Sequence, residues 1–293
     1  MKVSLIQMNS QPDVAGNLEQ AEVLLRRAIQ RDNPDLLVLP EHFDWAGGTA
    51  QQKIMAADSI PGGKAYEMLR MVARRHRVWI HAGSILERIA GQTQIFNTSV
   101  IFNDLGEEVG RYRKIHLFDI TAPDGKAYLE SATVARGKDL FVYEMHGLRI
   151  GCAICYDLRF SRLFDALASR QVDVIVLPAA FTLQTGKDHW EVLCRARAIE
   201  FQSYFVACGQ WGSYSAANGE TRSYYGNSMI CDPWGQVVAR ASDGVGIITA
   251  HIDAARLRDV RLLIPMGAHR EDFPKCRICP AFDTPSSDRT AAE

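Results

Sequence analysis

Cys155 is the most informative residue of this 293-residue chain. It follows the apolar run LRIGCAI, residues 148–154, and opens the segment CYDLRFSRLFDALASR, which we expect to be helical. A side chain at such a strand-to-helix corner points out over the carboxyl end of a sheet, and the amides that open the helix face whatever the sulfur attacks. Cys155 is therefore a candidate nucleophile. The alternative for a lone cysteine is a buried thiol that fills a small apolar gap.

A nucleophilic cysteine needs help, because a thiol with a pKa near ~8.5 is mostly protonated at neutral pH. Glu41 follows the apolar run DLLVLP, Lys114 ends RYRK, and Glu130 lies in the loop of residues 120–140. Each alone has a plain structural explanation as a solvated acid, a strand-end lysine or a helix-start charge. Their joint occurrence with Cys155 predicts a site with a carboxylate to move protons and an ammonium to balance negative charge.

Histidine is the more common partner of a catalytic cysteine, which makes His116 and His189 competing candidates. Metal chemistry is not expected, because the eight histidines form no His-Glu-x-x-His motif or other ligand spacing. We expect no cofactor either, since no Gly-x-x-x-x-Gly-Lys-Ser/Thr loop precedes a helix.

Hydrophobic periodicity predicts an α/β fold built from two similar halves. The run DLLVLPEHF, residues 35–43, is repeated in pattern by DVIVLPAAF, residues 173–181, and both suit strands buried on two faces. Two βαβ halves would then meet in a pseudo-symmetric, two-layered sheet flanked by helices. The other expected elements are strands at 3–8, 78–85, 148–154 and 204–210, helices at 17–31, 64–76 and 190–202, and hairpins at 99–114 and 228–240.

Composition is that of an ordinary globular protein, with 47% apolar and 23% charged residues. The formal net charge of −1 predicts no nucleic-acid or anionic-membrane partner, because such partners need clustered, uncompensated Lys and Arg. No apolar stretch reaches the ~18 residues of a membrane span, so we expect a cytoplasmic protein. The seven cysteines form no ladder of pairs and are expected to be reduced. We interpret Cys276 and Cys279 as surface thiols rather than a zinc or redox motif.

The ordered motifs resemble the nitrilase superfamily of carbon–nitrogen hydrolases over about residues 2–270. Within it the chain is most similar to the Nit branch of omega-amidases and deaminated glutathione amidases, which CYDLRF and TGKDHWE support. The stretches that carry the resemblance are LPEHF, RYRKIHLFD, YLES, GCAICYDLRF, PAAF, TGKDHWEVLCRARAIEFQ and YYGNSMICDPWG. The resemblance implies one carbon–nitrogen hydrolase domain over 1–270 with an αββα sandwich fold, usually a homodimer or larger homo-oligomer. Residues 271–293 form a polar tail whose end we expect to be disordered.

The resemblance also implies roles for the candidate residues. Glu41 corresponds to the general base, Lys114 to the oxyanion partner, Cys155 to the nucleophile and Glu130 to a second glutamate that shapes the site. His116 becomes a support for the lysine loop and His189 a residue of the pocket wall or of a helix start. The chemistry of these residue types agrees with amide hydrolysis through a thioester, with the backbone amide of Tyr156 as a second oxyanion donor.

We therefore expect a hydrolase that cleaves the terminal primary amide of a small carboxylic acid, of the 2-oxo class, to the acid and ammonia. The alternatives are a nitrilase or N-carbamoyl hydrolase with the same site, and a non-catalytic binding relative. The segment 178–190 is the candidate for substrate contacts. Its residues of interest are Phe181 and Trp190 as aromatic walls, Thr182 and Thr185 as hydroxyl donors, and His189.

Several residues keep two interpretations at this stage. Phe181 and Trp190 are equally plausible as core aromatics. Arg159, Arg195 and Arg197 could bind a substrate carboxylate, but ion pairing within the protein is the better interpretation of each one. Asn227 occupies a position in YYGNSM where Nit relatives often have histidine, so it would alter substrate choice if it lined the pocket.

Overall fold

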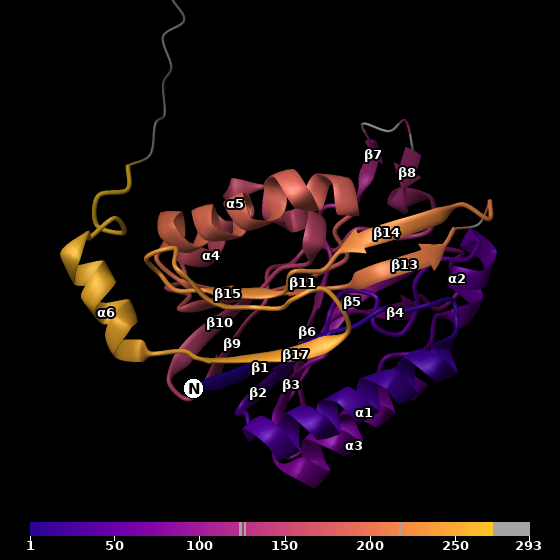
Figure 1. Cartoon of the computed structure of the whole chain (residues 1–293), viewed down its shortest axis with the longest axis horizontal. Coiled ribbons are helices and arrows are strands. Elements are labelled where there is room, and N and C mark those ends of the chain that lie inside the picture. The colour runs from indigo at the N-terminus through magenta and orange to yellow at the C-terminus, as the bar shows by residue number, and fades with distance from the viewer. Residues whose placement is uncertain (123–124, 126, 217, 272–293) are drawn as a thin grey trace, which may run out of the picture.

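The fold consists of two β-sheets packed face to face with helices on both outer surfaces (Figure 1). The computed structural model describes residues 1–122, 125, 127–216 and 218–271. In Figure 1, α1 and α3 cover one sheet from below, while α4 and α5 cover the other from above. This arrangement confirms the predicted four-layer αββα sandwich.

The first sheet belongs to the amino-terminal half, joined by one strand from the end of the described chain. Its order is β17-β1-β2-β3-β5-β4, with β6 also paired to β5. The β5–β6 pair is the predicted hairpin, and it is antiparallel as expected. The strands are β1 (Lys2–Gln7), β2 (Leu36–Val38), β3 (Trp79–His81), β4 (Ile85–Arg88), β5 (Ile95–Phe102), β6 (Glu108–Arg113) and β17 (Gly246–His251).

The second sheet repeats the parallel core of the first. Its order is β16-β15-β12-β11-β10-β9, and β10, β11 and β12 run parallel. The strands are β9 (Val142–Met145), β10 (Leu148–Cys152), β11 (Val174–Ala179), β12 (Tyr204–Gly209), β15 (Met229–Cys231) and β16 (Val237–Arg240). Two separate hairpins complete the strands, β7 (Asp119–Thr121) with β8 (Ala127–Leu129) and β13 (Trp211–Ser215) with β14 (Thr221–Tyr225).

The helices α1, α3, α4 and α5 pack through apolar faces on the outer surfaces of the sheets, whereas α2 has no buried residues. The helices of the structure are α1 (Val14–Asp32), α2 (Ala50–Ala56), α3 (Lys64–His76), α4 (Ser161–Ala168), α5 (Leu183–Phe201) and α6 (Ala254–Leu263), with 3-10 turns η1 (Glu130–Ala132) and η2 (Cys155–Arg159). No helix in these described ranges has the length and hydropathy that crossing a membrane requires.

Alternation along the buried strands explains why the sheets are covered on both faces. In β2, Leu36 and Val38 belong to the core between the sheets, whereas Leu37 points into the core under α1 and α3. In β1, Leu5 likewise belongs to the core between the sheets and Ile6 to the core under α1 and α3. Such strands need apolar residues at every position, which is the continuous pattern that the sequence carries.

Three predicted elements need correction. Helix α5 starts at Leu183 rather than near Trp190, so most of the expected loop 178–190 is helical. Cys155 opens a 3-10 turn before α4 begins, because α4 starts only at Ser161. The expected loop 120–140 contains the β7–β8 hairpin and η1.

One element near the site, α2, was not predicted from the sequence at all. Its signal is a capping box, in which the Thr49 hydroxyl accepts from the Gln52 amide and the Gln52 side chain accepts from the Thr49 amide. Of the predicted tail 271–293, only Glu271 lies within the described residues, so Cys276 and Cys279 lie outside them.

Candidate active site

The predicted catalytic residues come from the ends of separate strands and meet in one pocket. Glu41 follows β2, Lys114 follows β6 and Cys155 follows β10. Together with Glu130 and Tyr156 they line a pocket of about 510 Å³. The two sheets bring these strand ends together, although the residues are far apart in the sequence.

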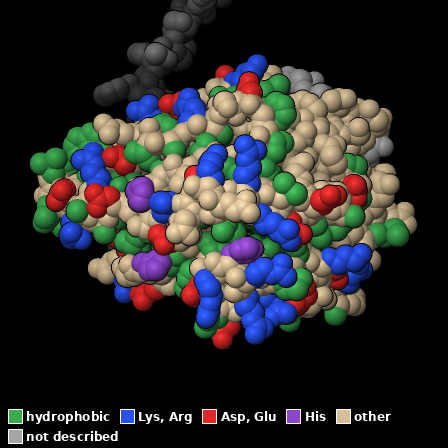
Figure 2. Space-filling model, turned by 60° about the horizontal axis from the view of Figure 1, so that its bottom comes forward, with side chains coloured by type: hydrophobic (Ala, Val, Ile, Leu, Met, Phe, Trp, Pro, Cys, Tyr) green, Lys and Arg blue, Asp and Glu red, His purple; other side chains and the backbone are tan. Residues whose placement is uncertain are grey.

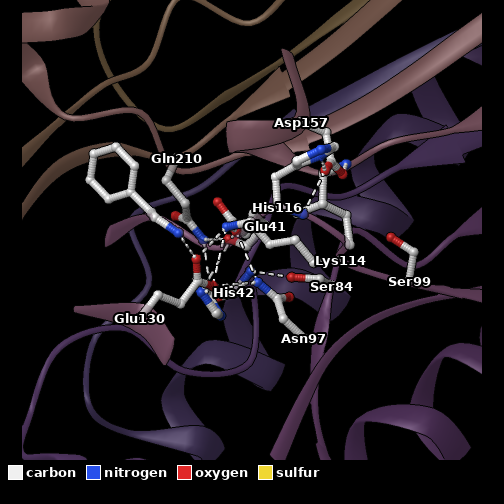
Figure 3. A network of polar contacts seen from close by, with 12 residues as sticks. Glu41, His42, Ser84, Asn97, Ser99, Lys114, His116, Glu130, Asp157 and Gln210 are labelled. Atoms are coloured by element: carbon white, nitrogen blue, oxygen red, sulfur yellow. Dashed lines mark hydrogen bonds and ion pairs between the residues drawn. The ribbon is translucent and has the colours of Figure 1, made fainter. Parts of the chain in front are cut away.

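Lys114 lies between the two carboxylates (Figure 3). Its Nζ is 2.8 Å from Glu41 Oε1 and 2.8 Å from Glu130 Oε2, and its side chain is 2% exposed. The Asn97 amide donates to both carboxylates, at 2.9 Å to Glu41 and 3.3 Å to Glu130. The Phe118 backbone N–H adds a 2.7 Å hydrogen bond to Glu130. Each carboxylate is thereby held in one orientation against the ammonium.

The backbone around Glu41 is held from both halves of the molecule. Gln210 donates its side-chain amide to the Glu41 carbonyl at 3.0 Å, and the His42 amide donates to the Ser84 hydroxyl at 2.9 Å. His42 has a φ of 55°, in the left-handed region that a non-glycine residue adopts only when its surroundings hold it there. These contacts point the Glu41 side chain toward Lys114.

Cys155 also has left-handed backbone geometry, with a φ of 47°. Its sulfur lies in the same pocket as the Glu41 carboxylate, near enough for the Glu41 charge to raise the pKa of the thiol. The turn is held by the fully buried Asp157, whose carboxylate accepts from the Ile154 amide at 2.9 Å and from the Tyr112 hydroxyl at 2.7 Å. A strained turn of this kind presents its side chain away from the sheet, toward the pocket.

The pKa shifts describe a site with a neutral thiol beside an ionised carboxylate. Burial and the Glu41 charge raise the pKa of Cys155 well above its ordinary value. Burial acts to raise the pKa of Glu41, but neighbouring groups, Lys114 foremost, together hold this pKa below its ordinary value. Burial similarly opposes the ionisation of Glu130, yet the positive charge of Lys114 holds its pKa at about 2. The carboxylate of Glu41 is therefore ready to accept the thiol proton.

The charge of Lys114 is secured by the same pair of glutamates. Burial acts to lower the pKa of Lys114, but the charges of Glu130 and Glu41 raise it well above its ordinary value.

Tyr156 follows Cys155 in the first turn of η2. The first amides of a helical turn have no partner within the helix, so the Tyr156 N–H is free to face an oxyanion.

The predicted substrate-contact residues divide into two groups. Phe181, Thr182 and Thr185 line the pocket, and the two threonine hydroxyls are 2.8 Å apart. His189 and Trp190 do not line it, which corrects that part of the prediction. The reason is that α5 is already helical there: His189 lies on its exposed side, and Trp190 is buried, donating to the Asn227 carbonyl at 2.8 Å.

The three arginines considered from the sequence make contacts within the protein. Arg159 lies beside His189, with 3.2 Å between the guanidinium and the ring nitrogen. Arg197 donates to the Leu158 carbonyl and Arg195 to the Gly235 carbonyl. Among the described residues that line the pocket, none is one of these three arginines.

Asn227 and His116 also lie outside the pocket wall. Asn227 is in a left-handed turn with a φ of 55°, and its side chain donates to the Tyr225 carbonyl. His116 contacts Asp157 with its Nδ1 at 2.7 Å and stacks on Phe160. Its position next to the Cys155 turn makes it a structural neighbour, which gives no support to a Cys–His dyad.

Several pocket residues were missed by the sequence analysis. His42, Lys53, Arg222 and Tyr224 all line the pocket with the predicted residues. Burial lowers the pKa of His42 to about 4, so this ring is neutral at neutral pH. The two cations carry no local motif; only the capping box of α2 could have indicated that Lys53 lies on an ordered element.

The same cluster contains the one group of potential metal ligands in the described part of the chain. Oxygen or nitrogen atoms of Glu41, His42 and Glu130 lie within 4.8 Å of one another. Lys114 already places its ammonium within hydrogen-bond distance of both carboxylates. That positive charge occupies the position that a metal cation would need, so the donor set does not fit a metal.

Known proteins resemble this chain over most of its length. The sequence pattern of the carbon–nitrogen hydrolase family matches residues 2–262. A deaminated glutathione amidase from Synechocystis sp. (strain PCC 6803 / GT-S) is 40% identical over 90% of this chain and 96% of the relative. The human deaminated glutathione amidase is 39% identical over 92% of this chain and 81% of its own length. Omega-amidase NIT2-A of Xenopus laevis is 35% identical over 92% and 94%.

Solved structures show the same relationship. The C. elegans NitFhit protein has a TM-score of 0.84 and 34% identity over 92% of this chain, which spans only 64% of that longer chain. Saccharomyces cerevisiae Nit3, described as a member of branch 10 of the nitrilase superfamily, has a TM-score of 0.80 and 30% identity over 91% of this chain and 94% of its own. These matches confirm the resemblance found in the sequence and the expected class of enzyme, an amide-cleaving hydrolase. The chain belongs to the carbon–nitrogen hydrolase family.

Proposed function

We propose that this enzyme hydrolyses the terminal primary amide of a small carboxylic acid, of the 2-oxo class, to the acid and ammonia. The observation that carries the proposal is that Cys155 lines the same pocket as Glu41, whose carboxylate shares the Lys114 ammonium with Glu130. A nucleophile, a carboxylate base and a cation thus lie in one pocket before substrate binds. The names of the relatives, deaminated glutathione amidase and omega-amidase, support an acid amide as substrate.

The first half of the reaction forms a thioester on Cys155. Glu41 takes the thiol proton while the sulfur attacks the amide carbonyl carbon, which turns the carbonyl oxygen into an oxyanion. Lys114 and the Tyr156 backbone amide stabilise this oxyanion, and one well-placed donor typically contributes about 3 kcal/mol to such a step. Glu41 then returns the proton to the amide nitrogen, the carbon–nitrogen bond breaks, and ammonia leaves.

The second half regenerates the thiol. Glu41 accepts a proton from water, the resulting hydroxide attacks the thioester carbonyl, and the carbon–sulfur bond breaks. The acid product leaves and Cys155 recovers its proton. Glu130 supports both halves, because its charge keeps Lys114 protonated and its hydrogen bond holds the ammonium in place.

A panel of amides with mass spectrometry tests the proposal. Wild-type enzyme should release ammonia from ω-amides of dicarboxylic and 2-oxo acids, and intact-mass spectra should show an acyl adduct that maps to Cys155. Neither signal should appear with Cys155→Ala. Release from nitriles or N-carbamoyl acids in preference to amides would replace the proposed reaction by that of a nitrilase or carbamoyl hydrolase. A wild type without adduct or turnover would favour a binding relative.

We also propose that the enzyme works in the cytoplasm as a homodimer or larger homo-oligomer, without nucleic-acid or membrane partners. Reduced thiols fit this compartment, and the described cysteines are free and buried. On the face seen in Figure 2, Lys and Arg side chains are interspersed with Asp and Glu, without a field of one sign. Apolar residues on the outer side of α5 and the β15–β16 connection, Val192 and Trp234, are 66% and 42% exposed and suit a subunit contact. Sedimentation analysis of Trp234→Ser against wild type tests this contact.

A further inference from the structure

Two cations in the pocket wall have no part in the proposed reaction. Lys53 of α2 and Arg222 of β14 line the same pocket as Cys155, Glu41 and Lys114. The two segments are joined near the pocket mouth, where the Gly48 amide donates to the Ser215 carbonyl at 3.1 Å. Figure 1 shows α2 beside the ends of β13 and β14.

Lys53 is a cation without a bonded counterion among the described residues. Its side chain is partly buried, and none of the described residues forms a hydrogen bond or ion pair with its ammonium. Neighbouring charged groups act on the Lys53 ammonium through space only. Two of them, Glu41 and Glu130, already form ion pairs with Lys114. Burial lowers the pKa of Lys53 for this reason. An ammonium held partly out of water without an anion is costly, and a bound carboxylate would remove that cost.

Arg222 has donors left for a ligand. Its guanidinium lies over the Tyr128 ring, 4.4 Å from the centroid, and is 3.6 Å from the Glu220 carboxylate. It also shares a hydrogen bond with Tyr214. The Arg222 Nε is buried and has no hydrogen-bond partner among the described residues. The tyrosine and the single distant carboxylate hold the planar group in position without using all of its donors.

We propose that Lys53 and Arg222 form an anion subsite that binds the carboxylate of the substrate while its amide lies at Cys155. The inference rests on the proposed function and names the residues that give it acid specificity. The pocket wall carries three cations, Lys53, Lys114 and Arg222, against the two carboxylates of Glu41 and Glu130. A substrate carboxylate balances the excess positive charge of the wall, whereas a neutral amide leaves Lys53 without a bonded anion and a cationic amide adds repulsion.

Paired substrates separate acid recognition from catalysis. The probes are the monoamide of glutaric acid and the methyl ester of that monoamide, which present the same amide with and without a carboxylate. Lys53→Met should lower kcat/KM for the acid by roughly 10- to 100-fold, the range expected for one lost charge-assisted hydrogen bond. The loss should arise from a raised KM. The ester should keep its kcat/KM in Lys53→Met. Arg222→Met should act in the same direction.

The matched control is Lys64→Met, which removes an exposed lysine at the start of α3 and should leave both substrates unchanged. Equal loss for the acid and the ester would overturn the subsite, because Lys53 would then act on the charges of Glu41 and Glu130. Unchanged kinetics with both substrates, or a wild type that does not prefer the acid, would overturn it as well.

A binding measurement keeps the subsite distinct from the proposed function. Calorimetric titration with glutarate, which carries two carboxylates and no amide, should show binding to wild type and a loss of affinity in Lys53→Met. If wild type hydrolyses neither amide but shows this pattern, the proposed reaction fails and the subsite stands. If glutarate does not bind wild type, the subsite fails whatever the hydrolysis results are.

Discussion

At the residue scale, the site depends on one ammonium shared by two buried carboxylates. Glu41 is 2% exposed and lies in the same pocket as Glu130. Two like charges in such a place cannot both ionise without a cation between them. Lys114 supplies that cation, which is why the pKa of each carboxyl lies below its ordinary value despite burial. In the proposed reaction the lysine thus has two functions, as the partner of the oxyanion and as the group that keeps Glu41 ionised.

Replacing Lys114 should remove both functions at once. We expect Lys114→Met to reduce kcat/KM by at least about 100-fold, the usual loss for one oxyanion donor. The remaining activity should rise toward alkaline pH, because the pKa of the paired carboxyls increases when the ammonium is gone and Glu41 is then ionised only at higher pH. Ammonia release measured between about pH 6 and 9 checks both points. Lys64→Met is the control, and retention of more than a tenth of wild-type activity in Lys114→Met would contradict the assignment.

The carboxylate of Asp157 is a second residue-scale determinant, acting through the position of Cys155. It accepts from the Ile154 amide, the Tyr112 hydroxyl and both the amide and the ring of His116. We class it as a positioning residue, since it joins the nucleophile turn to the segment that follows Lys114.

Asp157→Asn should lower the free energy of unfolding by about 2–4 kcal/mol, because an amide replaces an acceptor oxygen that faces buried donors. It should lower kcat more than it changes KM, since the displaced sulfur still leaves the pocket walls in place. Urea unfolding and steady-state kinetics check the two effects. The control is Asp165→Asn at an exposed position of α4, which should change the free energy of unfolding by less than about 0.5 kcal/mol. A kcat equal to wild type in Asp157→Asn would show that the turn holds its geometry without this carboxylate.

At the element scale, the site is assembled where strands end and short helical turns begin. The β2, β6 and β10 ends carry the reactive groups, while α5 and the β13–β14 hairpin form the pocket wall opposite them. The packing of α5 on β14 is close at Gly186, where an added Cβ would lie 2.3 Å from the Tyr225 Cβ. This contact fixes the first turn of α5, and with it Thr182 and Thr185.

Gly186→Ala separates helix propensity from packing. Alanine favours a helix over glycine by about 1 kcal/mol, so propensity alone predicts stabilisation. The short contact with Tyr225 predicts the opposite, because backbone and strand must move apart. We expect a lower melting temperature and a raised KM, since the first turn of α5 carries pocket residues. Gln184→Ala, an exposed position in the same turn, should change neither. A more stable Gly186→Ala variant with unchanged KM would contradict the packing argument.

At the scale of the whole molecule, the two sheets share a core that contains an uncharged histidine. His81 of β3 is fully buried, and its Nδ1 is 3.4 Å from the Tyr143 hydroxyl of β9 in the other sheet. Burial lowers the pKa of His81 to about 3. In the unfolded chain the ring titrates near its ordinary value of 6.5. Between these values only the unfolded state binds the proton, so stability falls as pH falls through this window.

A variant that lacks the His81 ring should lose part of this pH dependence of stability. Between pH 7 and pH 5, wild type should lose about 2 kcal/mol more free energy of unfolding than His81→Leu, which has no ring to protonate. Comparing the two proteins cancels other titrating groups, including Asp44, whose pKa burial raises to about 7. Urea unfolding at the two pH values checks the difference. Equal losses in both proteins would mean that His81 binds its proton equally in the folded and unfolded states.

Much of the fold could be predicted because its signals are local. The apolar runs that became β1, β2, β10, β11 and β12 are continuous in the sequence, and the hairpin turn after β5 carries its own glycine. The start of α5 was misplaced, since packing on β14 extends the helix through Thr185 and Gly186, beyond what the pattern indicates. Helix α2 was missed because it is short and has no buried residues, so periodicity could not reveal it.

The sequence by itself indicated which residues carry the proposed chemistry, since Glu41 and Cys155 each follow an apolar run and Lys114 ends the second arm of a hairpin, and these patterns are local. Only the tertiary structure decided how they are used. It placed one ammonium against two carboxylates, excluded His189 and Trp190 from the wall, and brought Lys53 and Arg222 to the same pocket. The physical reason is that burial and charge pairing depend on chain segments that meet only when the two sheets pack, and no sequence spacing records those contacts.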